Sequence, residues 1–135
     1  MTREDLSLAD KILDPASRSS VDLPGMRLLV LHGSRARGDA GPQSDWDFGY
    51  LAGEPLDPTG LLARLTMAVG TDAVDLVDLS GASALLRFRA ARDGVVLLER
   101  PAGAFAEFQL EAVRFWCDAG PVIRAAQVDV LAALG

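Results

Sequence analysis

Four short apolar segments alternate along the chain with segments of helical periodicity, and this alternation constrains the fold more than any other feature. Each apolar segment has the length of a β-strand and ends near glycine, serine or a charged residue. The predicted strands are residues 26–33, 46–53, 73–80 and 95–100. The predicted helices are residues 5–13, 56–70, 83–94, 103–120 and 121–134. The order indicates a small α/β domain in which helices cover a sheet of about four strands.

The helix boundaries carry recognisable start and stop signals. Asp57 can cap a helix that has Pro58 in its first turn, and Gly70 can end it. Gly94 is a comparable stop for the next helix. The following segment spaces Phe105, Phe108, Ala112 and Phe115 at three- and four-residue steps. That spacing is typical of an amphipathic helix, interrupted at Gly120-Pro121.

Length and composition favour one globular domain over the whole of residues 1–135, with a core of about 26–100 and C-terminal helices at 101–135. Half of the residues are apolar, yet no run approaches the roughly 20 residues of a membrane helix, and residues 1–11 lack a signal-peptide core. The lone Cys117 excludes an internal disulfide and makes a cytoplasmic location the expectation. We expect it to be a buried, small apolar residue.

The net charge of −6 argues against general binding to nucleic-acid phosphates, because such binding requires a positive surface. It leaves a nucleotide ligand open, since bound cations can reverse the local charge. No membrane association is expected either.

The segment from Gly33 to Asp47 combines two kinds of chemistry. Gly33 allows a sharp turn at the end of a strand and a close approach of a ligand to the backbone. Ser34 begins a short helical turn and offers a hydroxyl and backbone N–H groups to a phosphate. Asp45 and Asp47 project from the same face of a strand, while Trp46 points into the core. Paired carboxylates attract hard cations such as Mg²⁺.

A third carboxylate would complete a two-metal site. Asp75 lies within an apolar strand, where a buried carboxylate needs a compensating partner. Asp78 is three residues further on and faces the other side of a regular strand. We prefer Asp75, and Asp78 stays open as the alternative because the strand register is itself inferred.

The stretch "GSRARGDAGPQSDWD" resembles the signature of the minimal nucleotidyltransferases, a family within the DNA polymerase beta-like nucleotidyltransferase superfamily. That signature is Gly-Ser, ten intervening residues and then Asp-x-Asp, and the interval from Ser34 to Asp45 has this spacing. The similarity continues through "VDLVDL" and "LLRFRAARDGVVLLER" and covers roughly Met26 to Arg100. It implies the polymerase beta-like fold, with a mixed sheet of about four strands flanked by helices.

The resemblance also implies an activity. Asp45 and Asp47 would bind two Mg²⁺ ions, and Asp75 would complete the second ion's site and help to activate the acceptor hydroxyl. Gly33 and Ser34 would hold the β- and γ-phosphates of ATP. The acceptor oxygen would attack the α-phosphorus, so that AMP is transferred and pyrophosphate leaves. Arg35 and Arg37 would contact the triphosphate or an anionic acceptor.

Small members of this family resemble antitoxins that transfer AMP onto a tyrosine of a HEPN-type toxin, a helical ribonuclease. The acidic pI of about 4.6 suits a basic, RNA-directed partner of that kind. Two alternatives remain: nucleotidyl transfer to a small molecule such as an aminoglycoside, and a non-catalytic module that binds a partner. The roughly 35 residues after the last strand are too few for the full helical substrate domain of aminoglycoside-modifying relatives, but suffice for a partial acceptor-binding lid. The oligomeric state, including a homo-oligomer, is left open.

Other candidate residues have simpler interpretations. His32 is the only histidine, and we expect its ring to be packed or solvated at a strand end rather than catalytic. Arg87, Arg89 and Arg92 fit the solvated face of a helix, the alternative being a contact with the triphosphate or an acidic partner. The chain contains neither a Walker-type phosphate loop nor a dinucleotide-binding fingerprint.

Overall fold

A computed structural model describes residues 8, 11–14 and 23–119 of the chain. Its elements are β1 (Met26–His32), α2 (Gly33–Arg37), β2 (Trp46–Ala52), α3 (Pro58–Val69), β3 (Val74–Asp78), α4 (Ala84–Asp93), β4 (Val95–Glu99) and α5 (Ala104–Asp118). The predicted order of strands and helices is confirmed over this part. Of the predicted N-terminal helix, Leu8 and residues 11–13 are helical, and the predicted helix over 121–134 lies outside the described residues.

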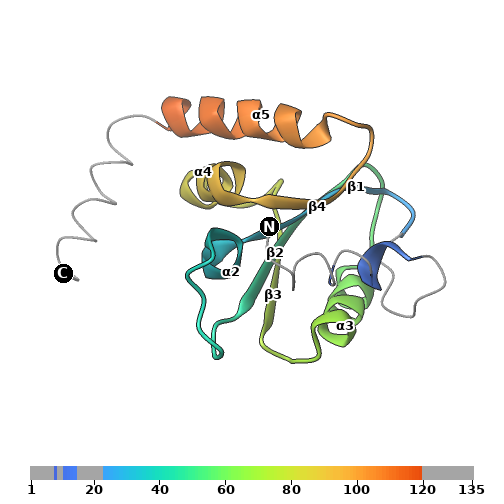
Figure 1. Ribbon diagram of the computed structural model, residues 1–135. Coiled ribbons are helices and arrows are strands. Elements are labelled where there is room, and N and C mark those ends of the chain that lie inside the picture. The colour runs from blue at the N-terminus through green and yellow to red at the C-terminus, as the bar shows by residue number, and fades with distance from the viewer. Residues whose placement is uncertain (1–7, 9–10, 15–22, 120–135) are drawn as a thin grey trace.

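The four strands form one mixed sheet in the order β3-β2-β1-β4 (Figure 1). β1 is central and pairs antiparallel with β2 and with β4. β2 pairs in parallel with β3, and α3 makes the crossover that this parallel pair requires. The predicted mixed sheet of about four strands is therefore confirmed.

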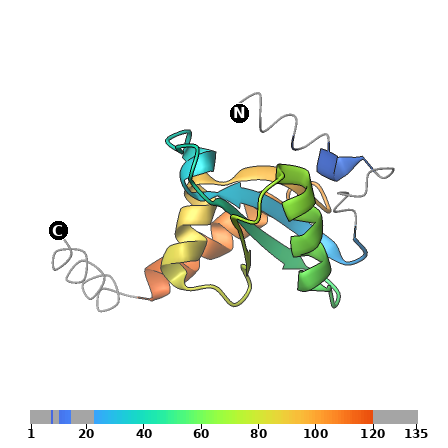
Figure 2. The ribbon, with the colours of Figure 1, turned by 90° about the horizontal axis from the view of Figure 1, so that it is seen from below.

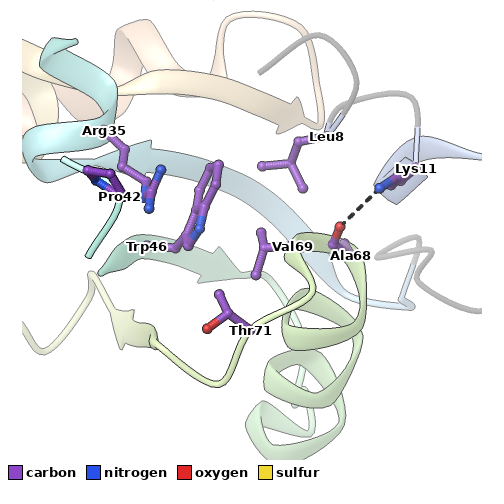
Figure 3. A pocket seen from close by; sticks show the side chains of 8 residues that line it. All are labelled: Leu8, Lys11, Arg35, Pro42, Trp46, Ala68, Val69 and Thr71. Carbon is purple, nitrogen blue, oxygen red and sulfur yellow. Dashed lines mark hydrogen bonds between the residues drawn. The ribbon is translucent and has the colours of Figure 1, made fainter. Parts of the chain in front are cut away.

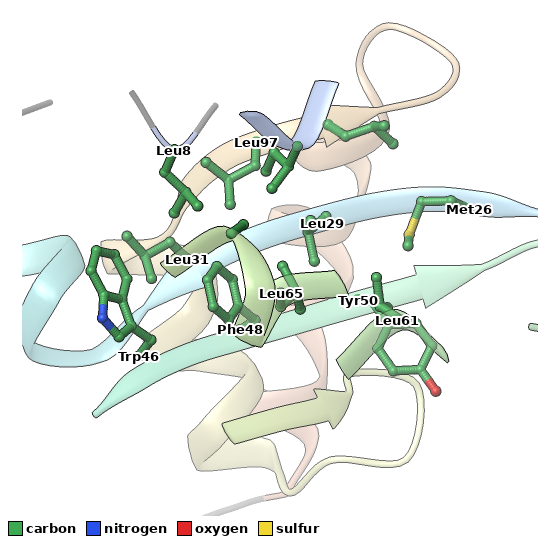
Figure 4. Packing of buried hydrophobic residues seen from close by; sticks show 13 residues of the cluster. Leu8, Met26, Leu29, Leu31, Trp46, Phe48, Tyr50, Leu61, Leu65 and Leu97 are labelled. Atoms are coloured by element: carbon green, nitrogen blue, oxygen red, sulfur yellow. The ribbon is translucent and has the colours of Figure 1, made fainter. Parts of the chain in front are cut away.

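Helices cover both faces of the sheet, as the two perpendicular views show (Figures 1 and 2). On one face, α3 and the short N-terminal helical segment bury an apolar cluster against β1 and β2, drawn in Figure 4. Phe48 and Leu29 of the strands meet Leu61 and Leu65 of α3, and all four are fully buried. Since side chains alternate along a strand, the neighbouring positions serve the other face.

The second cluster lies between the sheet and the pair α4 and α5. Leu28 and Val30 of β1 contact small residues of α4, Ala90 and Ala91, together with Phe108 of α5. Alanines in α4 allow this helix to lie close to the sheet. The carboxylates described below are on this face, at the N-terminal end of β2.

The predicted boundaries of α3 agree with the structure. The Asp57 side chain accepts a hydrogen bond of 3.1 Å from the Thr59 N–H, and Pro58 occupies the first turn. Gly70 ends the helix in the left-handed conformation with φ of 77°.

The expectation of a buried Cys117 is wrong. α5 packs through Phe108 and Ala112, and Cys117 falls on its exposed side. Within the described ranges, no helix is both long and apolar enough to cross a membrane.

Candidate active site

The turn from β1 into α2 is built around Gly33. Its φ of +73° belongs to the left-handed region, which residues with a Cβ atom rarely adopt. A Cβ atom built on Gly33 would lie 2.3 Å from Oδ2 of Asp47 and 3.1 Å from its Cγ. The glycine is thus required twice, by its backbone conformation and by the carboxylate that lies against it. Ser34 follows as the second residue of α2, which has no side-chain N-cap.

The predicted carboxylates come from two neighbouring strands. Asp47 and Asp75 are register partners across the parallel pair β2 and β3, so both side chains leave the sheet on the same face. Asp45 immediately precedes β2 and is exposed. Burial raises the pKa of Asp47, and the charges of Asp75 and Asp45 raise it further, against a lowering by His32 and Arg37. The structure therefore places the Asp45, Asp47 and Asp75 carboxylates in one electrostatic environment.

Asp75 differs in one respect from the expectation. Instead of being buried within an apolar strand, it is exposed, because β3 is the edge strand of the sheet. An exposed carboxylate needs no compensating partner inside the protein. It is also open to a ligand.

Asp78, the alternative, lies at the other end of β3 as the register partner of Tyr50. Its Oδ1 accepts hydrogen bonds from the backbone N–H and the hydroxyl of Ser80, at 2.9 Å and 2.7 Å. Asp78 caps the turn after β3, whereas Asp75 lies beside Asp47.

His32 ends β1 as the register partner of Asp47 on the antiparallel side. It is buried, with 8% of its surface exposed, and within the described part of the chain its Nε2 has no hydrogen-bond partner. Burial lowers the pKa of His32, while the Asp47 charge opposes the shift. Of the two arrangements expected for the ring, packed or solvated, the structure shows the packed one. Sequence reasoning missed its pairing with Asp47, which only a known strand register reveals.

The two arginines of α2 have contacts within the protein. Arg35 donates from Nε and Nη2 to the Ser44 carbonyl oxygen at 3.1 Å and 2.8 Å, and its guanidinium lies 4.2 Å from the centre of the Trp46 ring. It therefore ties the end of the connecting loop back to α2. Arg37 forms ion pairs with Asp39 at 3.3 Å and with Asp93 of α4 at 4.0 Å.

Two members of the α4 arginine cluster also have local partners. Arg87 donates from Nε to the Ala82 carbonyl oxygen at 3.0 Å, and its guanidinium lies 4.5 Å from the centre of the Phe115 ring. Arg92 pairs with Asp93 at 2.8 Å. Arg89 is exposed. Arg87 thus braces α4 against the turn before it and against α5.

The donor set fits a hard divalent cation in its chemistry. Carboxylate oxygens are the ligands that Mg²⁺ prefers, and a dication would relieve the repulsion that raises the Asp47 pKa. Among the residues that the structure describes, no three His, Cys, Asp or Glu side chains are gathered closely enough to hold a metal ion already. The carboxylates are adjacent, but their oxygen atoms do not surround a common position.

A glycine turn packed on one of several neighbouring carboxylates, at one end of a mixed four-stranded sheet, is the arrangement of a nucleotidyltransferase domain. Residues 19–102 match the family model described as polymerase beta, nucleotidyltransferase. The chain belongs to this nucleotidyltransferase family, as its Gly-Ser and Asp-x-Asp motifs indicate.

The chain is 36% identical over 100 residues to the protein adenylyltransferase MntA of Aphanizomenon flos-aquae (strain 2012/KM1/D3). The alignment covers 64% of this chain and 66% of that relative, just under two thirds of its length.

Two solved structures resemble the chain over nearly its whole length. One is a toxin-antitoxin with AMP-PNP, with a TM-score of 0.70 and 26% identity over 96% of this chain and 99% of the other. The second is an MNT antitoxin in complex with the tri-AMPylated HEPN toxin of Shewanella oneidensis, with a TM-score of 0.67 and 26% identity over 95% and 98% of the two chains. These similarities agree with the polymerase beta-like fold expected from the sequence.

Proposed function

We propose that this protein transfers AMP from ATP to a tyrosine hydroxyl of a HEPN-type toxin and acts as the antitoxin of that partner. The observation that carries the proposal is the Asp47 carboxylate, which lies against Gly33 and in register with Asp75. Asp47 thereby contacts the proposed phosphate-binding turn and also forms, with Asp75, a pair of carboxylates on adjacent strands. The similarity to the adenylyltransferase MntA and to an antitoxin complexed with an AMPylated HEPN toxin supports the acceptor.

In this proposal, Gly33 and Ser34 hold the β- and γ-phosphates of ATP. The turn brings backbone N–H groups toward the phosphates without a side chain at position 33 in the way. The similarity to a toxin-antitoxin with AMP-PNP supports ATP as the nucleotide. Arg37, whose charge reaches Asp47, is the proposed cationic contact to the triphosphate. Arg35, on the same short helix, is bonded to the Ser44 carbonyl oxygen and lies over Trp46 on the other face, so it is not assigned to the triphosphate.

The carboxylates would hold two Mg²⁺ ions, with Asp45 and Asp47 binding both and Asp75 completing the second. Bound metal supplies charge neutralisation at the attacking and leaving oxygens and lowers the pKa of the acceptor hydroxyl. The tyrosine oxygen forms a bond to the α-phosphorus while the bond from that phosphorus to the β-phosphate oxygen breaks. The hydroxyl proton passes by way of Asp75 to solvent, and pyrophosphate leaves.

We further propose that the whole chain works as one domain. Residues 26–100 carry the chemistry, and residues 101–135 contribute to acceptor binding. Because ATP is the proposed substrate, the reaction belongs in the cytoplasm.

The test incubates the protein with Mg²⁺, ATP labelled at the α-phosphate and a lysate of cells that express a HEPN-type toxin. Label on the toxin is expected, and it should be absent after substitution of the acceptor tyrosine by phenylalanine. The Asp47→Asn variant is the catalytic control, because it removes one charge at nearly constant shape. Label on an aminoglycoside with none on protein would refute the antitoxin proposal. Full toxin neutralisation by Asp47→Asn in cells would refute catalysis as its basis.

A further inference from the structure

A cavity of about 450 Å³ lies on the face of the sheet opposite to the carboxylates (Figure 3). Its walls come from the N-terminal helical segment, the loop before β2, Trp46 and the end of α3. The volume is within the range of small-molecule sites, about 300–1,000 Å³. The cavity is separate from the proposed catalytic site, because Trp46 and Asp47 are consecutive on β2 and point to opposite faces.

Among the residues that the structure describes, the cavity is lined by two cations and no acidic side chain. Lys11 is the only lysine of the chain, and Arg35 is the second cation. This lining is unusual in a protein with 19 acidic residues and a net charge of −6. A positively lined hollow in a negatively charged molecule concentrates anions there.

The two cations are held at opposite sides of an apolar middle. In Figure 3, Arg35 lies at one side and Lys11 at the other, with Trp46, Leu8 and Val69 between them. Arg35 is fixed by its hydrogen bonds to Ser44 through Nε and Nη2, and Nη1 carries two further N–H donors. The Lys11 ammonium has a long contact of 3.5 Å to the Ala68 carbonyl oxygen. The Thr71 hydroxyl adds a neutral polar group.

We propose that this cavity binds a small organic anion with a planar, apolar body. The anionic group would pair with Lys11 at one side of the cavity, and the planar body would pack beside Val69 and Trp46 toward Arg35 at the other side. An organic phosphate such as a nucleoside monophosphate and an aromatic carboxylate share this chemistry. The proposal stands apart from AMP transfer and requires no metal ion.

Fluorescence of Trp46 provides a direct readout. The chain has two tryptophans, and Trp116→Phe keeps an aromatic ring against Phe88 while leaving Trp46 as the only tryptophan, which is excited selectively over tyrosine. In this background, with EDTA present, AMP and benzoate are titrated as the organic phosphate and the aromatic carboxylate. Adenosine lacks the charge and inorganic phosphate lacks the planar body, so both serve as controls. At least one of AMP and benzoate should saturate with a Kd of about 1 mM or below, and both controls should bind at least about tenfold more weakly.

Charge reversal tests the assigned residues. Lys11→Glu should weaken binding by at least about tenfold, because it replaces one of the two cations with an anion. The matched variant Arg114→Glu, on the exposed side of α5, should leave binding unchanged. Asp47→Asn should also bind normally, since its side chain lies on the other face. Circular dichroism verifies that each variant is folded.

The outcomes decide the proposal. Binding of AMP alone identifies the ligand as an organic phosphate, and comparable binding of benzoate extends it to aromatic carboxylates. The proposal is overturned by the lack of a saturable change with either anion, or by equal affinities of Lys11→Glu and Arg114→Glu. It is equally overturned if Asp47→Asn changes the affinity for AMP by about tenfold or more in either direction, because AMP then occupies the catalytic face. None of these measurements depends on whether the protein transfers AMP.

Discussion

The Asp47 carboxylate occupies the space where a Cβ atom of residue 33 would lie, 2.3 Å from Oδ2. Gly33→Ala should therefore destabilise the protein by about 2–5 kcal/mol, from left-handed backbone strain and the displaced carboxylate together. Gly38 is the matched control, because its φ of +82° imposes similar strain and nothing lies within 4 Å of its Cβ position. Gly38→Ala should cost about 1–2 kcal/mol and keep activity. Urea denaturation measures the loss of stability in each variant, and the transfer assay measures activity. Equal losses of stability in Gly33→Ala and Gly38→Ala would contradict the assigned packing.

Asp75 and Asp78 can be separated by identical substitutions. Asp75→Asn should lower AMP transfer by about 100-fold or more, because it removes a carboxylate beside Asp47. Asp78→Asn should retain transfer, since Asp78 caps Ser80 at the far end of β3 and Asn keeps an acceptor oxygen. Initial rates with labelled ATP provide the comparison. The reverse ranking would identify Asp78 as the third carboxylate.

Asp47→Asn should remove activity and yet stabilise the metal-free protein at neutral pH. Burial and the neighbouring carboxylates raise the folded-state pKa of Asp47 above its ordinary value of 3.8, so the fold favours the protonated form. The stability from this group is present below pH 3.8 and is lost as the pH rises through the folded-state pKa. Removing the charge should raise the Tm at pH 7, and each 1 kcal/mol of relieved penalty raises it by about 3–5 °C in a domain of this size. A lower Tm in EDTA would contradict this account.

His32 should make the fold sensitive to mild acid. Burial lowers its pKa below 6.5 in the folded state, so the unfolded chain binds the proton more tightly. The stability from this group is complete above pH 6.5 and declines as the pH falls toward the folded-state pKa, by at most about 1.4 kcal/mol per pH unit. Urea denaturation at a series of pH values should show this decline in the wild type. His32→Gln should lack it, and an unchanged pH profile in that variant would assign the effect to other groups.

Local sequence signals predicted the boundaries of α3, because Asp57, Pro58 and Gly70 act on the nearest turn of backbone. The spacing of Ser34 and Asp45 predicted that turn and carboxylates would meet, because two neighbouring strands connected by a loop of that length bring them together. Strand order was not readable in the same way. The exposure of Asp75 follows from the edge position of β3, and the His32–Asp47 pairing follows from register. Cys117 was misassigned because the periodicity of α5 does not reveal how much of its surface is covered.

The hydrogen bonds from Arg35 to Ser44 have a consequence for the length of the loop between the two motifs. Together with the bond from the Asp39 N–H to the Ser34 carbonyl, they close residues 34–44 into a ring anchored on α2. These hydrogen bonds, and not the number of residues between Ser34 and Asp45, then fix where β2 starts. Residues inserted beside Ala40 would enlarge the ring, with each doubling of its length costing only about 0.6 kcal/mol of closure entropy. The ten-residue interval is thus one of several loop lengths that the fold can accommodate. The hydrogen bonds from Arg35 to Ser44 are the part of the loop that must be retained.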